Sequence, residues 1–248
     1  MKLQVAACLF ASAAAVMLVA QDGRAESSRC DDERRSARLT ARKILDEWPI
    51  RGRDFLTDYV DRMARRIIDR SGLGGEPWRI FVVRNLSANG FSVGDGYLFV
   101  NEGALLRAET ESQLAAVLAH EIGHEVVGHF CRSNEASFPW GWNPFLAENE
   151  PEFTGKSSKL GSVHQIVDPT KELEADRRAL DLLWVAGFDP RAMLQVARRV
   201  AADTDASDRF GDARVVELEH ILESIQTRHV VDSEEFLWIK QQLQRALN

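Results

Sequence analysis

The sequence has no surplus of positive charge, no internal repeat and few cysteines. It carries 31 Lys and Arg against 38 Asp and Glu, so its formal net charge is -7 at pH 7 and its pI is near 5.5. A surface that binds nucleic acid through the phosphates needs a basic stripe. The arginines instead alternate with acids, as in the run from Asp61 to Arg66, which is typical of solvated helix faces. We therefore expect no nucleic-acid partner.

Long hydrophobic runs are missing from the sequence except at its start. Lys2 precedes a nearly unbroken apolar stretch that ends at Ala20, and polar residues follow. This order is typical of a bacterial signal peptide, with small residues before cleavage points after Ala20 and Ala25. We expect residues 1–25 to be removed and the mature protein to be periplasmic. The lesser alternative is an uncleaved membrane anchor, because about 18 apolar residues approach the length of a membrane span.

The few cysteines also bear on the compartment. Cys8 lies inside the N-terminal apolar stretch, so the mature protein keeps Cys30 and Cys131. In an oxidising periplasm, two cysteines in one domain favour a disulfide. Such a bond would join the N-terminal segment to the end of the helix that carries the histidine motif described below.

Residues 26–248 contain enough apolar material for one sizeable core and too little length for two. We therefore predict one domain, α+β in class and mostly helical. Helices are expected at 33–48, 54–71, 111–127, 170–186, 191–203, 212–228 and 232–246, and strands at 78–83, 91–93 and 97–100. We expect Gly94-Asp95-Gly96 to form a hairpin turn and residues 132–169 to form a long loop.

The motif His120-Glu121-Ile122-Gly123-His124 places two imidazoles four residues apart on one helix. They are separated by about 40° around the helix axis, so both can reach one metal ion. Glu121 projects to the side of that face, where a carboxylate can take the proton of an attacking water. Zinc suits a mixed nitrogen and oxygen ligand set, which leaves one position open for water.

A second acidic cluster, within 172–176, is the candidate source of the third ligand. Glu172 and Asp176 are four residues apart and share a helix face, whereas Glu174 points away from it. We predict Glu172 as the third metal ligand and Asp176 as the carboxylate that orients a ligating histidine. The alternative for this segment alone is an ordinary charged helix surface.

The other histidines have weaker claims on the metal. His129 lies about 140° around the helix from His124, and we expect it to be structural. His164, in the predicted long loop, could swing onto the metal and block it, but a surface histidine is the commoner case. His220 and His229 have no motif to recommend them.

Together these residues resemble the HtpX and CAAX-prenyl-endopeptidase type of zinc peptidase, metallopeptidase family 48, and in particular its soluble periplasmic members such as BepA and LoiP. The resemblance covers about 89–190. It is carried by Asn89-Gly90-Phe91, Gly96 to Asn101, Leu114 to Ala119, the histidine motif at 120–124, His129, the acidic cluster at 172–176 and Gly187-Phe188-Asp189-Pro190. It implies a gluzincin fold, one zinc ion bound through His120, His124 and Glu172, Glu121 as the base, and a substrate laid in extended form against an edge strand of a small sheet.

One segment departs from the family pattern. Members usually carry a Thr-His-Pro segment, followed by an arginine, after the region of the third ligand. The best alignment here is Ser207-Asp208-Arg209 followed by Arg214, so that Asp208 replaces the histidine. The group that stabilises the oxyanion is therefore unassigned, with Arg209 a weak candidate.

The sequence leads to two functional hypotheses. The first is a periplasmic zinc endopeptidase that cleaves unfolded or misassembled envelope proteins. The second is a zinc-containing chaperone-like or binding protein of the envelope with little turnover, motivated by the missing Thr-His-Pro segment and by an aromatic loop at 138–145. That loop is a lid, a contact for outer-membrane protein partners or a core plug.

Overall fold

The computed structural model describes residues 30–70, 74–75, 77–130, 168–203, 209–226 and 228–247. Several predictions fall outside these residues and are therefore not examined by the structure: the signal peptide at 1–25, the aromatic loop at 138–145, Cys131, His164 and Asp208. Cys30 is disulfide-bonded, and both other cysteines lie outside the described residues. Its pairing with Cys131 stays a prediction.

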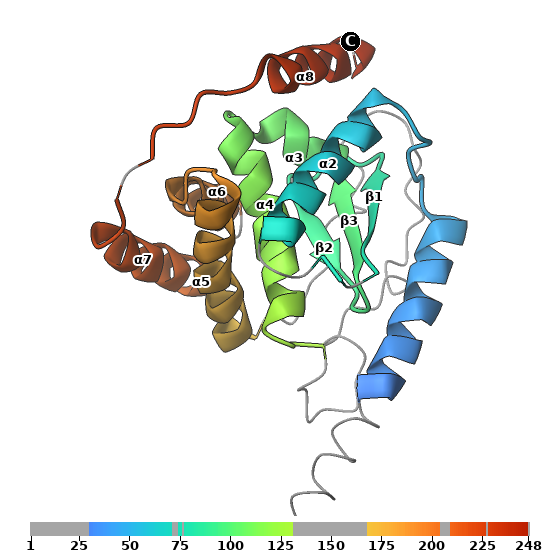
Figure 1. The fold of residues 1–248 in the computed structure, drawn as a ribbon, viewed down its shortest axis with the longest axis horizontal. Coiled ribbons are helices and arrows are strands. Elements are labelled where there is room, and N and C mark those ends of the chain that lie inside the picture. The colour runs from blue at the N-terminus through green and yellow to red at the C-terminus, as the bar shows by residue number, and fades with distance from the viewer. Residues whose placement is uncertain are drawn as a thin grey trace, which may run out of the picture.

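The described chain is mostly helical around a small sheet, which confirms the predicted fold class (Figure 1). A helix at 30–47 comes first. The labelled elements are α2 (Phe55–Arg70), β1 (Arg79–Val83), β2 (Gly90–Ser92), β3 (Tyr97–Asn101), α3 (Glu102–Arg107), α4 (Glu111–Val126), α5 (Pro169–Ala186), α6 (Arg191–Asp203), α7 (Arg209–Glu223) and α8 (Glu234–Leu247).

The sheet has the order β1-β3-β2, so β2 lies at one edge. β1 pairs with β3 in parallel, and β2 pairs with β3 antiparallel. The predicted hairpin between β2 and β3 is confirmed: Gly94, Asp95 and Gly96 all have positive φ, at 90°, 53° and 73°. Two glycines make this turn possible, because most residues with a Cβ avoid that region.

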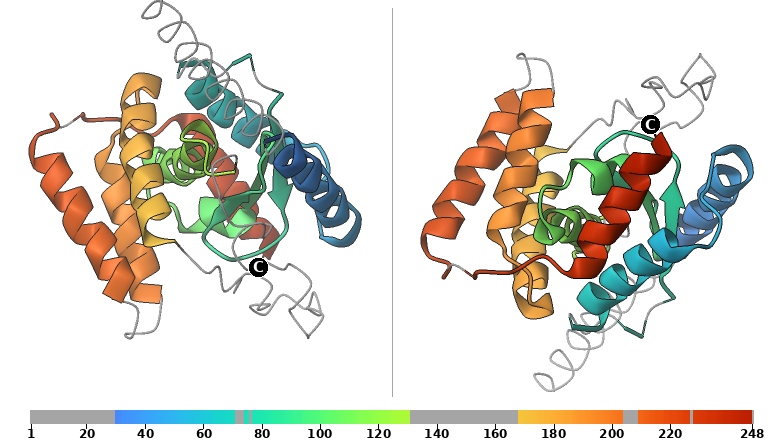
Figure 2. Two further views of the ribbon diagram at one scale, coloured as in Figure 1. Left: turned by 90° about the horizontal axis from the view of Figure 1, so that it is seen from below. Right: turned by 90° about the horizontal axis from the view of Figure 1, so that it is seen from above.

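Alternating side chains of the strands enter two separate apolar clusters. Val82, Leu98 and Val100 belong to the main core, which also includes α2 and α4. Val83 and Phe99 point to the other face and join a smaller cluster with residues of the 30–47 helix. Since successive strand residues point to opposite faces, both faces of the sheet are covered. Figures 1 and 2 show the sheet between the 30–47 helix on one side and α4 on the other.

The helix α5 lies alongside α4, on the side of α4 away from the sheet (Figures 1 and 2). It begins where the Asp168 carboxylate accepts the backbone N–H of Thr170 and Pro169 occupies the first turn, an arrangement that favours helix initiation. It ends, as predicted, at Gly187, whose φ of 84° closes the helix in the left-handed conformation. α4 and α5 are the two helices that carry the histidine and acidic motifs.

No helix among the described residues is long and apolar enough to span a membrane.

Candidate metal centre and active site

The helix α4 is buried on nearly all sides, because it lies between the sheet and α5. Thr110 caps its start by accepting the backbone N–H of Gln113. Leu114 through Ala119 are then almost wholly enclosed. An apolar helix of this kind is held by packing rather than by an amphipathic stripe. It delivers the polar motif that follows, His120 to His124, into the interior of the protein.

Close approach of α5 to α4 depends on Gly123, the fourth residue of the histidine motif. A Cβ placed on Gly123 would lie 2.9 Å from the carbonyl oxygen of Ala175. Glycine therefore lets the two backbones come nearer than any other residue would permit. Because Ala175 lies between Glu172 and Asp176 on α5, this contact sets how near the two carboxylates lie to the histidines.

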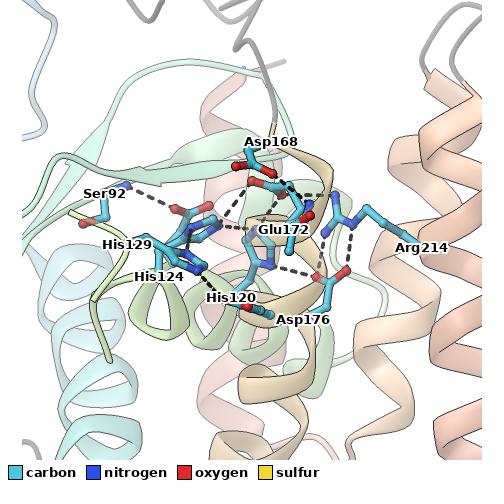
Figure 3. Close-up of polar contacts among 11 residues, drawn as sticks. Ser92, His120, His124, His129, Asp168, Glu172, Asp176 and Arg214 are labelled. Atoms are coloured by element: carbon cyan, nitrogen blue, oxygen red, sulfur yellow. Dashed lines mark hydrogen bonds and ion pairs between the residues drawn. The ribbon is translucent and has the colours of Figure 1, made fainter. Parts of the chain in front are cut away.

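Three side chains from these helices meet at one point (Figure 3). The Nε2 atoms of His120 and His124 lie 3.2 Å apart, and they lie 3.2 and 3.4 Å from the two carboxylate oxygens of Glu172. One ligand atom from each residue falls within a set no more than 4.8 Å across. His120, His124 and Glu172 are the group of three His, Cys, Asp or Glu side chains, among the described residues, that could hold a metal ion.

The other ring nitrogen of His120 faces Asp176. The distance from His120 Nδ1 to Asp176 Oδ1 is 2.8 Å, and Asp176 is buried. Arg214, from α7, donates two hydrogen bonds to the same carboxylate at 2.6 and 2.7 Å, and it lies 3.4 Å from Glu172. Asp176 thus fixes the ring of His120, and Arg214 fixes Asp176.

Glu121, which follows His120 on α4, reaches the end of β2. Its carboxylate accepts the backbone N–H of Ser92, at the end of β2, at 3.1 Å. Burial raises the pKa of Glu121 to about 7, and the nearby Glu172 carboxylate acts in the same direction. A carboxylate with a pKa near neutrality is suited to accept and return a proton at physiological pH.

His129 lies beyond the end of α4 and folds back to the motif. Its Nδ1 is 2.9 Å from His124 Nδ1, and its Nε2 is 3.0 Å from Glu174 Oε2. Glu174 lies off the face of Glu172, as the helix period predicts, but it contacts His129. His120 and His124 therefore each have a polar partner for Nδ1, the ring nitrogen that does not face Glu172.

Burial and pairing shift the ionisation of the site in opposite directions. Burial alone would lower the pKa of His120, but hydrogen bonds to Asp176 and Glu172 outweigh it and raise that pKa to about 10. Burial would likewise raise the pKa of Glu172, yet the two histidines hold it well below its usual range. The pKa of His124 is lowered, mainly by burial. The site therefore keeps the carboxylates of Glu172 and Asp176 ionised beside the two imidazoles, and this negative charge favours a cation.

Sequence reasoning missed part of this arrangement. The sequence predicts only that Ser92 lies in a strand, that Glu174 points away from the face of Glu172, and that Arg214 aligns with a family arginine. None carries a local signal for its contact, because each meets its partner from a different element. The one available signal was the family pattern, in which an arginine follows the third-ligand region, as Arg214 does here.

The donor set fits zinc. Two imidazole nitrogens and one carboxylate oxygen are ligands that zinc prefers, and three protein ligands leave one position for water or substrate. Asp176 and His129 occupy the Nδ1 atoms, so the Nε2 atoms are the ones directed to the common point. A group able to move a proton, Glu121, lies next to this point on the same helix.

Comparison with known proteins agrees with this site. The model of peptidase family M48 matches residues 55–237. The chain is 32% identical over 178 residues to the mitochondrial metalloendopeptidase OMA1 of Schizosaccharomyces pombe, an alignment that covers 69% of this chain and 53% of that protein. It is 28% identical over 184 residues to the beta-barrel assembly-enhancing protease of Yersinia pestis, covering 69% of this chain and 38% of the relative.

A third relative is the metalloprotease LoiP of Escherichia coli, with 25% identity over 138 residues, 53% of this chain and 54% of LoiP. The chain thus spans only part of the length of these curated relatives. The resemblance to BepA-like and LoiP-like peptidases is confirmed. Because the family model covers most of the chain, including both motifs, the protein belongs to peptidase family M48.

Proposed function

We propose that this protein is an exported, zinc-dependent endopeptidase that hydrolyses unfolded or misassembled proteins of the bacterial envelope. One observation carries the proposal: His120, His124 and Glu172 converge within 4.8 Å of one another, with Glu121 on the same helix. His120, His124 and Glu172 hold the zinc, one ion per chain, and Asp176 orients His120.

Bound zinc would supply the electrophile that polarises the scissile carbonyl and lowers the pKa of water. Glu121 takes a proton from the attacking water and passes it to the leaving amine. Its pKa of about 7, raised by burial, supports a group that can do both near neutral pH. The hydrogen bond from Ser92 keeps the carboxylate turned to the side of the metal ligands.

The substrate is a polypeptide in extended form, added to the side of β2 that does not pair with β3. β2 lies at the edge of the sheet, and the N–H of Ser92 points outward to Glu121 rather than to β3. A chain paired with this edge would pass directly over the general base. Since backbone hydrogen bonds provide most of the affinity in this mode, unfolded proteins of varied sequence are suitable substrates.

The sequence and the relatives support the proposed location and partners. Residues 1–25 have the pattern of a signal peptide, so residues 26–248 would form one peptidase domain in the periplasm. The Yersinia pestis relative is named for beta-barrel assembly. That name supports envelope proteins as substrates and outer-membrane proteins as partners.

A zinc-containing chaperone-like protein with little turnover is the second candidate. The observation that favours it is that Arg214 is already engaged: its guanidinium binds Asp176 and lies beside Glu172. Arg214 is therefore not free to stabilise an oxyanion. Arg209 begins α7, but the structure does not describe its side chain.

Casein hydrolysis by the parent and by Glu121→Gln distinguishes the two candidates. The variant should keep its zinc and lose more than about 100-fold of the activity, because the amide cannot accept the proton. Glu219→Gln, on an exposed part of α7, is the matched control and should cleave like the parent. Equal cleavage by Glu121→Gln and parent would contradict the proposed mechanism. A parent that holds zinc but does not cleave would favour the chaperone-like protein.

A further inference from the structure

We propose that His129 is a positioning residue that fixes the ring of His124 for metal binding, and that Glu174 in turn fixes His129. We refer to His124, His129 and Glu174 as the histidine chain. The inference rests on the proposed function, because it assumes that His124 is a metal ligand.

The histidine chain leads from the site to the protein surface. His124 and His129 are buried, with 7% and 3% of their surfaces exposed, whereas the side chain of Glu174 is 49% exposed. The two contacts are 2.9 Å between the Nδ1 atoms and 3.0 Å between His129 Nε2 and Glu174 Oε2. Figure 3 shows the ring of His129 next to that of His124, on the side away from Arg214.

A sharp reversal after α4 makes this contact possible. Gly128 has a φ of 75°, a conformation that glycine adopts without strain. The N–H of His129 then returns to the carbonyl oxygen of His124 at 3.1 Å. This backbone bond brings a residue five positions further along the chain beside the imidazole, a contact that continued helix would not provide.

The positions of the protons follow from the contacts. If His124 binds the metal through Nε2, its Nδ1 carries the proton and donates to His129 Nδ1. His129 must then carry its own proton on Nε2, which donates to the Glu174 carboxylate. Each contact has one donor and one acceptor, so a single tautomer of each ring satisfies the whole histidine chain.

The two ligating histidines are therefore supported differently. His120 donates to the carboxylate of Asp176, which Arg214 also binds. His124 donates to a neutral imidazole, whose orientation depends in turn on Glu174. Loss of a group that orients a metal-ligating histidine typically weakens metal affinity by about 10- to 100-fold. We expect an effect of this size when His129 loses its acceptor nitrogen.

The test compares the zinc affinity of the full-length mature protein and its variants by competition with a chelator. His129→Leu should bind zinc roughly 10- to 100-fold more weakly than the parent. His129→Asn places an acceptor oxygen near the position of Nδ1 and should recover most of that loss. His220→Leu, an exposed histidine on α7, is the control and should match the parent. Cobalt-substituted protein should show an altered ligand-field spectrum in His129→Leu and not in His129→Asn.

Two results would overturn the inference. One is a folded His129→Leu protein with the zinc affinity of the parent. The other is an equal loss in His129→Leu and His129→Asn, which would mean that the imidazole acts through packing alone. Casein cleavage by the parent is measured separately, so a failure of the proposed function can be distinguished from a failure of the inference about His129. A parent that binds zinc without cleaving casein refutes hydrolysis, while the order of the affinities still decides the role of His129.

Discussion

Gly123 of α4 lies so close to the carbonyl oxygen of Ala175 on α5 that there is no room for a side chain at position 123. A Cβ on Gly123 would be 2.9 Å from that oxygen and 3.4 Å from Ala175 Cα. Both atoms belong to helix backbone, which cannot yield locally without moving α5. The spacing of α4 and α5, and with it the distance from the histidines to Glu172, is set at this contact.

Gly123→Ala should therefore destabilise the protein and weaken metal binding together. In an isolated helix the change would stabilise by up to about 1 kcal/mol, because alanine is the better helix former. The clash with Ala175 should outweigh this gain and lower both the melting temperature and the zinc affinity. Gly52→Ala is the control, since a Cβ there meets nothing within 4 Å. A Gly123→Ala protein as stable as the parent would show that α5 moves away at no cost.

Arg214→Ala should be among the more destabilising substitutions in the protein. His120 and Arg214 together hold the pKa of the buried Asp176 carboxyl below its usual range. The substitution removes Arg214 as a partner of that carboxylate. Breaking a buried ion pair costs about 3–5 kcal/mol. Urea unfolding measures the loss. Arg177→Ala removes an ion pair with Glu217 on the surface and should cost less than about 1 kcal/mol. Similar losses in both variants would contradict this account of Arg214.

Glu125 gives the protein a pH dependence that does not involve catalysis. Burial raises its pKa from 4.5 to about 7, although the hydroxyl of Ser92 donates to it at 2.6 Å. A carboxyl whose pKa is raised by folding stabilises the native state when protonated. That contribution is fully present below the unfolded pKa of about 4.5 and is lost as the pH rises through about 7.

The Glu125→Gln variant does not titrate at this position. Relative to it, the parent should lose on the order of 2–3 kcal/mol of unfolding free energy between pH 4.5 and pH 8. Urea unfolding of both proteins at these two pH values measures the difference, and shifts of other groups cancel in the comparison. If the two proteins keep the same difference in stability at both pH values, the carboxyl of Glu125 is not buried as described.

Much of the fold and most of the site could be predicted from residue spacing. The four-residue interval between His120 and His124 specifies a shared helix face, and the same interval relates Glu172 to Asp176. The hairpin at 94–96 and the end of α5 at Gly187 were predicted from glycines that the structure places at positive φ. These features depend on neighbouring residues, so the local sequence contains their physical cause.

Other features depend on contacts between distant elements and left no local trace. The helix α3 follows β3 directly and is only six residues long, too short to show a period. α7 begins at Arg209 and ends at Glu223, whereas 212–228 was predicted. The contacts of Arg214 and Glu174 require α7 and the residues after α4 to fold against α5. Spacing within one helix carries no information on such packing.

The metal content of the parent and of Glu172→Gln tests the central claim most directly. Both proteins are purified without chelators and analysed for zinc per chain, with Glu219→Gln, on an exposed part of α7, as the control. We predict about one zinc per chain in the parent and in Glu219→Gln, and a large loss in Glu172→Gln, because an amide oxygen is a poor substitute for the carboxylate. Equal zinc in the parent and in a folded Glu172→Gln protein would contradict the assignment of the third ligand.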